Sequence, residues 1–309
     1  MAKRDFSISN LKQVREFGNI EFLAKQLVEG FITGLHRSPF HGFSVEFAEH
    51  RLYNTGESTR HIDWKVYAKT DRLFIKRYEE ETNLRCQVLL DISSSMYYPQ
   101  ESNGKLTFSI LAASALAYML QKQRDAVSLC TFHDEIELHT QTKSTPSHIH
   151  KLFVTLENLL KSSDQKRGKK TSVAETIHKI ADKISRRSLV IIFSDMFDNS
   201  EDSENLFSAL QHLKHNQHEV LLFHVNDKKT EEEFDFEERP HEFIDLETGE
   251  RVKLQPSEIR DFYQQKVKEY YKSLKLKCGQ YKIDFIEADI KHGFDQILYA
   301  YLVKRSKMK

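Results

Sequence analysis

Residues 86–95 read CQVLLDISSS, an apolar run that ends in an aspartate and three serines. A largely apolar run without strict alternation predicts a strand covered on both faces of its sheet. Four further runs have this character: AVSLCTF at 126–132, LVIIFSD at 189–195, EVLLFHV at 219–225 and KIDFIEA at 282–288. The segment EIELHT at 135–140 alternates instead, which predicts an edge strand.

Helical patterns separate these runs, near residues 105–122, 145–161, 172–185, 203–216, 257–277 and 294–303. Alternating strands and helices predict an α/β fold, with a mostly parallel six-stranded, Rossmann-like sheet flanked by helices. We expect this domain to span residues 85–309, with a hairpin insertion at about 228–256. Residues 1–84 hold an N-terminal helix and a turn-rich segment, which we expect to pack on that domain.

Composition narrows the possible classes of function. The chain has 309 residues, with 46 Lys and Arg against 46 Asp and Glu, so no net charge draws it toward nucleic acid. The most apolar stretch, residues 106–120, is shorter than a membrane-spanning helix needs, and the start MAKRDFSISN is no secretory signal. The three cysteines form no CxxC pair, which favours a reducing cytoplasm.

The strand ends carry a candidate metal site. Asp91, Ser93 and Ser95 offer a carboxylate and two hydroxyls from one turn, which are hard ligands suited to Mg²⁺, Mn²⁺ or Ca²⁺. Thr171 precedes a predicted helix and Asp195 ends a predicted strand, so parallel topology should bring all five to one edge of the sheet. Capping and turn formation offer a purely structural alternative. A lysine filling the cation position would argue against the metal.

A second stretch carries a longer pattern. Residues 51–64, RLYNTGESTRHIDW, match the pattern RxYxxGExxRxIDW. Together with DISSS, Thr171 and Asp195, this stretch resembles the bacterial domain-of-unknown-function fifty-eight family. Ser58, Lys65 and Lys69 depart from the usual family pattern. The resemblance implies a von Willebrand factor A-like fold with a metal-ion-dependent adhesion site. It also implies a chaperone-like role beside a MoxR-type AAA+ ATPase and a third, client protein.

The residues of this pattern allow two interpretations. Oppositely charged and aromatic side chains alternate within it, namely Arg51, Tyr53, Glu57, Arg60, Asp63 and Trp64. They could form an ion-paired turn that docks on the α/β domain, because Arg pairs bidentately with carboxylates. They could also form a docking surface for a partner, because Trp, Tyr and Arg are frequent interface anchors.

Three functions compete. The first is a non-enzymatic module that grips a partner carboxylate through the bound metal. The second is a phosphatase of haloacid-dehalogenase type with Asp91 as nucleophile, but Ser93 stands where that chemistry uses a second acid. The third is nucleic-acid binding through the basic residues 166–170 and the C-terminal tail, which the zero net charge disfavours.

Overall fold

The computed structural model describes residues 19–35, 49–53, 59, 64–77, 84–100, 102, 104–161, 173–196, 203–246 and 249–308. The chain divides into two compact units, one made of residues 33–83 and the other of the remaining chain. The predicted packing of the N-terminal segment on the α/β domain stays a prediction.

A six-stranded sheet forms the centre of the larger unit, in the order β10-β7-β6-β3-β4-β5. Its strands are β3 (Arg85–Asp91), β4 (Ala126–Phe132), β5 (Ile136–His139), β6 (Leu189–Ser194), β7 (Glu219–Asn226) and β10 (Asp284–Asp289). All neighbours pair in parallel except β5, which runs antiparallel to β4 at the edge. The predicted α/β class and the mostly parallel sheet are confirmed.

The strand order fixes where a ligand can bind. From β3 the chain first moves outward to β4 and β5, then returns to the other side of β3 and continues through β6, β7 and β10. The order therefore reverses between β3 and β6, and ligands of open α/β sheets bind outside the carboxyl ends of the strands at such a point.

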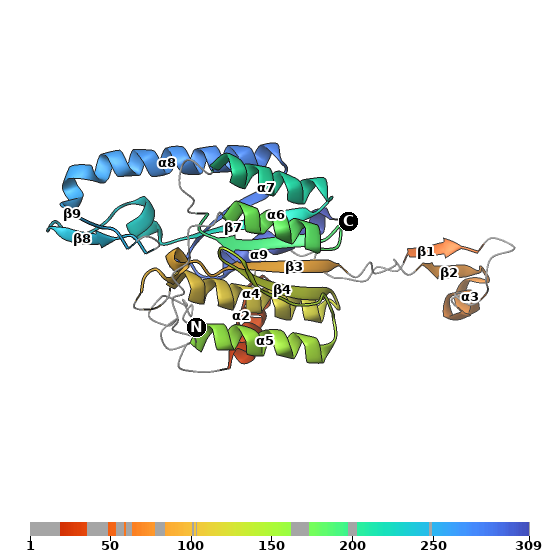
Figure 1. Cartoon of the computed structure of the whole chain (residues 1–309). Helices are drawn as coiled ribbons and strands as arrows, with labels where there is room; N and C mark the ends of the chain where they lie inside the picture. The colour runs from red at the N-terminus through yellow and green to blue at the C-terminus, as the bar shows by residue number, and fades with distance from the viewer. Residues whose placement is uncertain are drawn as a thin grey trace. The chain divides into compact units, whose positions relative to one another are not determined.

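Helices cover both faces of the sheet (Figure 1). One layer contains α6 (Val173–Lys183), α7 (Ser203–His215) and α8 (Pro256–Gln280); the other contains α2 (Ile20–Leu35), α4 (Gly104–Lys122), α5 (Pro146–Lys161) and α9 (Asp295–Lys307). Helix α4 is buried from residue 104 to residue 120, because α5 and α9 pack on it as well as the sheet. Such all-round burial explains its uniformly apolar sequence. Among the described helices, none combines the length and apolarity that a membrane crossing requires.

The insertion after β7 begins with η3 (Lys228–Glu232), a single π-helical turn, and continues into β8 (His241–Ile244) and β9 (Arg251–Leu254). These two strands pair antiparallel as the predicted hairpin. Phe234 is buried under it against Phe236, Phe243 and Tyr263.

Helix α8 holds the start of this insertion through its backbone. Tyr263 donates its hydroxyl to the Glu231 carbonyl at 3.0 Å, Gln264 donates to the Glu233 carbonyl at 2.6 Å, and Arg260 donates to the Phe236 carbonyl at 3.3 Å. The acidic run at 231–238 looks like a solvated surface in sequence. That expectation is wrong for Glu231, whose side chain is only 16% exposed.

The smaller unit contains β1 (Glu49–Leu52), α3 (Trp64–Thr70) and β2 (Phe74–Arg77), with β1 and β2 paired antiparallel. Tyr53 follows β1, and its N–H donates to the Leu73 carbonyl at 2.9 Å. Trp64 begins α3, is 61% exposed and meets Tyr67 edge to face. Arg51 lies within β1. The candidate signature residues Glu57, Arg60 and Asp63 lie outside the described residues, so neither interpretation of this segment is tested.

Candidate metal-ion site

Asp91 and Asp195 lie at the carboxyl ends of neighbouring strands. Asp91 is the last residue of β3, and Asp195 directly follows β6, so the two flank the point where the strand order reverses. Both residues are buried, with exposures of 1% and 2%. The structure thus brings two of the predicted ligands to the predicted edge, because parallel strands end on the same side of a sheet.

Hydrogen bonds orient the Asp91 carboxylate. Its Oδ1 accepts the Ser93 N–H at 2.9 Å, and its Oδ2 accepts the Ser194 hydroxyl at 2.5 Å. Burial and the negative charge of Asp195 raise the pKa of Asp91 to about 6, although the bonds from Ser194 and Ser93 favour the ionised form. Asp91 therefore carries a charge at neutral pH that its surroundings balance only in part.

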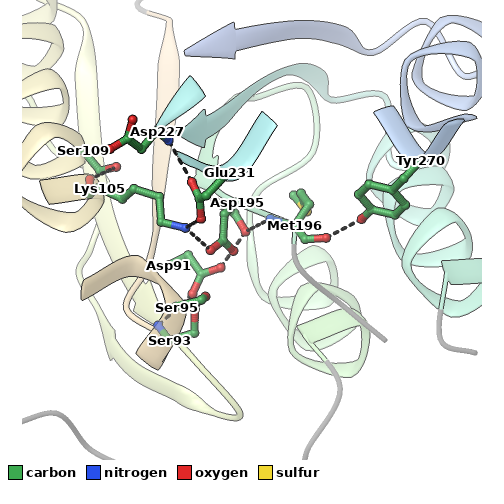
Figure 2. Close-up of polar contacts among 11 residues, drawn as sticks. Asp91, Ser93, Ser95, Lys105, Ser109, Asp195, Met196, Asp227, Glu231 and Tyr270 are labelled. Carbon is green, nitrogen blue, oxygen red and sulfur yellow. Dashed lines mark hydrogen bonds and ion pairs between the residues drawn. The ribbon is translucent and has the colours of Figure 1, made fainter. Parts of the chain in front are cut away.

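Ser93 and Ser95 lie beside this carboxylate (Figure 2). Ser93 directly precedes the short 3₁₀ helix η2 (Ser94–Tyr97), and its hydroxyl makes no capping bond but lies 3.0 Å from the hydroxyl oxygen of Ser95. Adjacent ligands of an octahedral Mg²⁺ lie about 3.0 Å apart, since each oxygen sits about 2.1 Å from the metal. The two hydroxyl oxygens, which share a hydrogen bond here, thus lie at a separation that neighbouring Mg²⁺ ligands also have, and the Asp91 carboxylate offers a third hard ligand.

A lysine at the same edge was not predicted. Lys105 stands in the first turn of α4 and is 1% exposed. Its ammonium lies 2.8 Å from Asp195 Oδ2 and 2.6 Å from Glu231 Oε1, as Figure 2 shows. Burial disfavours the charged ammonium, but the two carboxylates outweigh burial and raise the pKa of Lys105. Lys105 is therefore a permanent buried cation.

Lys105 binds one oxygen of a predicted metal ligand, and a lysine at the cation position is the feature that we expected to argue against the metal. Asp195 was expected to bind the metal directly, whereas its Oδ2 here accepts a hydrogen bond from Lys105. The lysine pairs with Asp195 and Glu231, while the described hydrogen bonds of Asp91 come from Ser93 and Ser194. Thr171 lies outside the described residues, so its predicted role is untested.

The carboxylates at this edge suit a hard divalent cation, because their negative charges outnumber the positive charge beside them. Two buried carboxylates, those of Asp195 and Glu231, share the ammonium of Lys105, and the Asp91 carboxylate adds a third negative charge that feels the charge of Asp195. The nearby Asp227 is balanced by Lys291 at 2.6 Å. In the described part of the chain, no group of three or more His, Cys, Asp or Glu residues is arranged to hold a metal. A metal at this edge would therefore depend on the serine hydroxyls.

The fold and this cluster define an α/β protein with an oxygen-rich turn at the switch point of its sheet. The chain belongs to the DUF58 family, described as a protein of unknown function, whose model matches residues 49–272. An uncharacterised protein of Mycobacterium tuberculosis, Rv1480, and one of Mycobacterium bovis, Mb1516, are each 22% identical to it over 188 residues. That match covers 61% of this chain and 58% of each relative.

Solved structures with similar folds have low identity. The conserved hypothetical protein BatB from Bacteroides thetaiotaomicron is 13% identical, with a TM-score of 0.41 over 73% of this chain and 98% of that one. An aerotolerance-related membrane protein from Bacteroides fragilis is also 13% identical, with a TM-score of 0.42 over 72% and 99% of the two chains.

Proposed function

We propose that the chain is a von Willebrand factor A-like module that binds a partner protein through a divalent metal ion and catalyses no reaction. The observation that supports this most is the 3.0 Å spacing of the Ser93 and Ser95 hydroxyls beside Asp91. Mg²⁺ suits this spacing, and Mn²⁺ or Ca²⁺ share its preference for oxygen.

In this proposal Asp91, Ser93 and Ser95 hold the ion, with Thr171 and Asp195 as further ligands. A cation bound mainly by uncharged hydroxyls keeps much of its positive charge and so attracts a carboxylate from another protein. The chain's own residues orient the turn: Ser194 and the Ser93 N–H fix the Asp91 carboxylate. Asp195 can contribute its Oδ2 to the ion when Lys105 releases that oxygen.

The phosphatase alternative has less support. Nucleophilic attack by Asp91 would need a general acid close by, and residue 93 is a serine whose hydroxyl contacts Ser95. Metal-dependent hydrolysis of an aryl phosphate that Asp91→Asn abolishes would favour the phosphatase over the binding module. Salt-dependent binding of oligonucleotides would favour the nucleic-acid alternative.

Partners follow from the family resemblance and belong to the proposal. We expect the chain to act with a MoxR-type AAA+ ATPase in the maturation or remodelling of a client protein that supplies the carboxylate. A cytoplasmic location agrees with its three buried free cysteines. The exposed Trp64 suits a docking role for the signature segment.

The decisive experiment measures metal binding first and partner binding second. Mn²⁺ is titrated into the full chain and the free ion is followed by electron paramagnetic resonance. Asp91→Ala and the double variant Ser93→Ala/Ser95→Ala should lose binding, while Ser94→Ala, in the same turn, should keep it. Capture of the client should then require Mg²⁺ and fail with a chelator. Equal Mn²⁺ affinity in all four proteins would refute the site.

A further inference from the structure

Lys105 and the proposed metal ion compete for one carboxylate. The ammonium holds Asp195 Oδ2 at 2.8 Å, and Asp195 is 2% exposed, so solvent cannot screen a second cation from the first. We propose that Lys105 gates the metal site: it binds Asp195 while no metal is present and is retained by Glu231 alone when a divalent cation takes Asp195. This inference rests on the proposed metal-dependent function.

Glu231 is placed to retain the lysine. Its Oε1 lies 2.6 Å from the Lys105 ammonium, and its Oε2 accepts the Asp227 N–H at 2.7 Å. Its backbone carbonyl accepts the Tyr263 hydroxyl from α8. Glu231 is therefore held from two sides independently of Asp195. A small rotation along the flexible four-carbon stem of Lys105 would separate the ammonium from Asp195 without leaving it unpaired.

The alternative partner makes such a displacement feasible. Breaking a buried ion pair is strongly unfavourable when one charge remains without a partner. Here neither charge is stranded, because the metal takes Asp195 and Glu231 keeps the lysine. Since Glu231 comes from the insertion and α8 fixes that segment, the gate also links metal affinity to the position of the insertion.

The gate predicts opposite effects for two variants. Glu231→Gln removes the ion pair that would retain the Lys105 ammonium after it leaves Asp195. Lys105 therefore stays on Asp195, and Mn²⁺ should bind about tenfold more weakly. In the double variant Lys105→Met/Glu231→Gln the lysine is gone, and Mn²⁺ should bind about tenfold more tightly than to the natural chain. The double variant keeps the net charge of the cluster, because it removes one ammonium and one carboxylate.

A matched control removes the neighbouring pair. Lys291→Met/Asp227→Asn also deletes one ammonium and one carboxylate at this edge, but neither group contacts Asp195 in the described structure. It should leave the Mn²⁺ affinity unchanged. Thermal unfolding followed by circular dichroism verifies that each variant is folded at the temperature of the titration.

Each outcome decides between the two proposals. Tighter binding by Lys105→Met/Glu231→Gln than by the natural chain supports the gate, including the case in which only the double variant binds measurably. Equal affinities of these two proteins, or weaker or no binding by the double variant alone, overturn the gate and leave the metal site standing. Absence of binding in both overturns the gate together with the proposed function.

Discussion

Ser194 joins the two strands that flank the candidate site, since its hydroxyl donates to Asp91 Oδ2 at 2.5 Å from the end of β6. The Ser194 hydroxyl oxygen also accepts the Met196 N–H at 3.0 Å. One side chain therefore sets both the orientation of the Asp91 carboxylate and the path of the chain as it leaves β6.

Replacing Ser194 with alanine should lower the free energy of unfolding by about 1–3 kcal/mol, because a buried carboxylate loses a donor. It should also weaken Mn²⁺ binding, since Asp91 is no longer held in place. Ser128→Ala is the matched control: Ser128 is equally buried in β4 and donates to Gln87, away from the site. Urea unfolding should show a loss for both variants, and Mn²⁺ titration a loss for Ser194→Ala only.

Lys105→Met alone should destabilise the chain by roughly 3–5 kcal/mol, because it leaves Asp195 and Glu231 without their shared cation. Lys304→Met provides the comparison. Lys304 also bridges two carboxylates, those of Glu219 and Asp284, but their side chains are 43% exposed, so its loss should cost about 1 kcal/mol or less. Urea unfolding without divalent metal measures both. If both variants lose a similar free energy of unfolding, the burial of the Lys105 ion pairs does not add to their contribution to stability.

Gly104→Ala should destabilise the start of α4. A Cβ at this position would lie 2.7 Å from Pro99 Cδ and 3.1 Å from Ile290 Cδ1, and the proline ring cannot turn aside. We expect a loss of about 1–3 kcal/mol. Gly30 in α2 has no atom within 4 Å of a built Cβ, so Gly30→Ala should stabilise the chain by about 0.5–1 kcal/mol. Thermal unfolding should therefore show shifts of opposite sign.

His224 should make the stability depend on pH. Burial lowers its pKa to about 4, with the charge of Asp195 opposing and that of Lys105 assisting this shift. The unfolded chain takes up a proton near pH 6.5 and the folded chain only near pH 4. The contribution of His224 to stability is therefore complete above about pH 6.5 and is lost as the pH falls toward 4, by about 2 kcal/mol between pH 7.5 and pH 5. The raised pKa of Asp91 acts in the opposite direction over this range, so the net loss of the chain is smaller.

His224→Phe should remove this component, because an aromatic ring fits between Tyr271 and Phe285 without a titrating group. The measurement is urea unfolding of both proteins at pH 7.5 and pH 5. His215→Gln, an exposed position on α7, should retain the natural pH dependence. If His224→Phe loses as much stability on acidification as the natural chain, another group is responsible.

Sequence reasoning reached the sheet and two strand ends because both depend on local patterns. The run LVIIFS is too short for a buried helix such as α4 and is typical of a strand covered on both faces, and parallel strands place Asp91 and Asp195 at one edge. The contacts of Lys105 span 90 and 126 residues of sequence, which no local pattern encodes. One signal was available: Lys105 opens a helix that is apolar all round, and a charge there must be buried with partners.

Glu231 was missed for a different reason. It stands first in an acidic run, and a run of like charges normally faces water. What distinguishes it from the exposed Glu233 is three-dimensional: its carboxylate meets Lys105 and the Asp227 N–H. Thr171 and most of the signature segment remain predictions.

The three donors from α8 hold the insertion by main-chain carbonyls, which every amino acid supplies. Most side chains of the acidic run can therefore be replaced while its backbone keeps the same path, because the hydrogen bonds from α8 do not depend on them. That course is determined by Arg260, Tyr263 and Gln264, which lie 24 to 32 residues after the carbonyls that they bind. Substitutions in α8 should therefore move the insertion more than substitutions in the insertion itself.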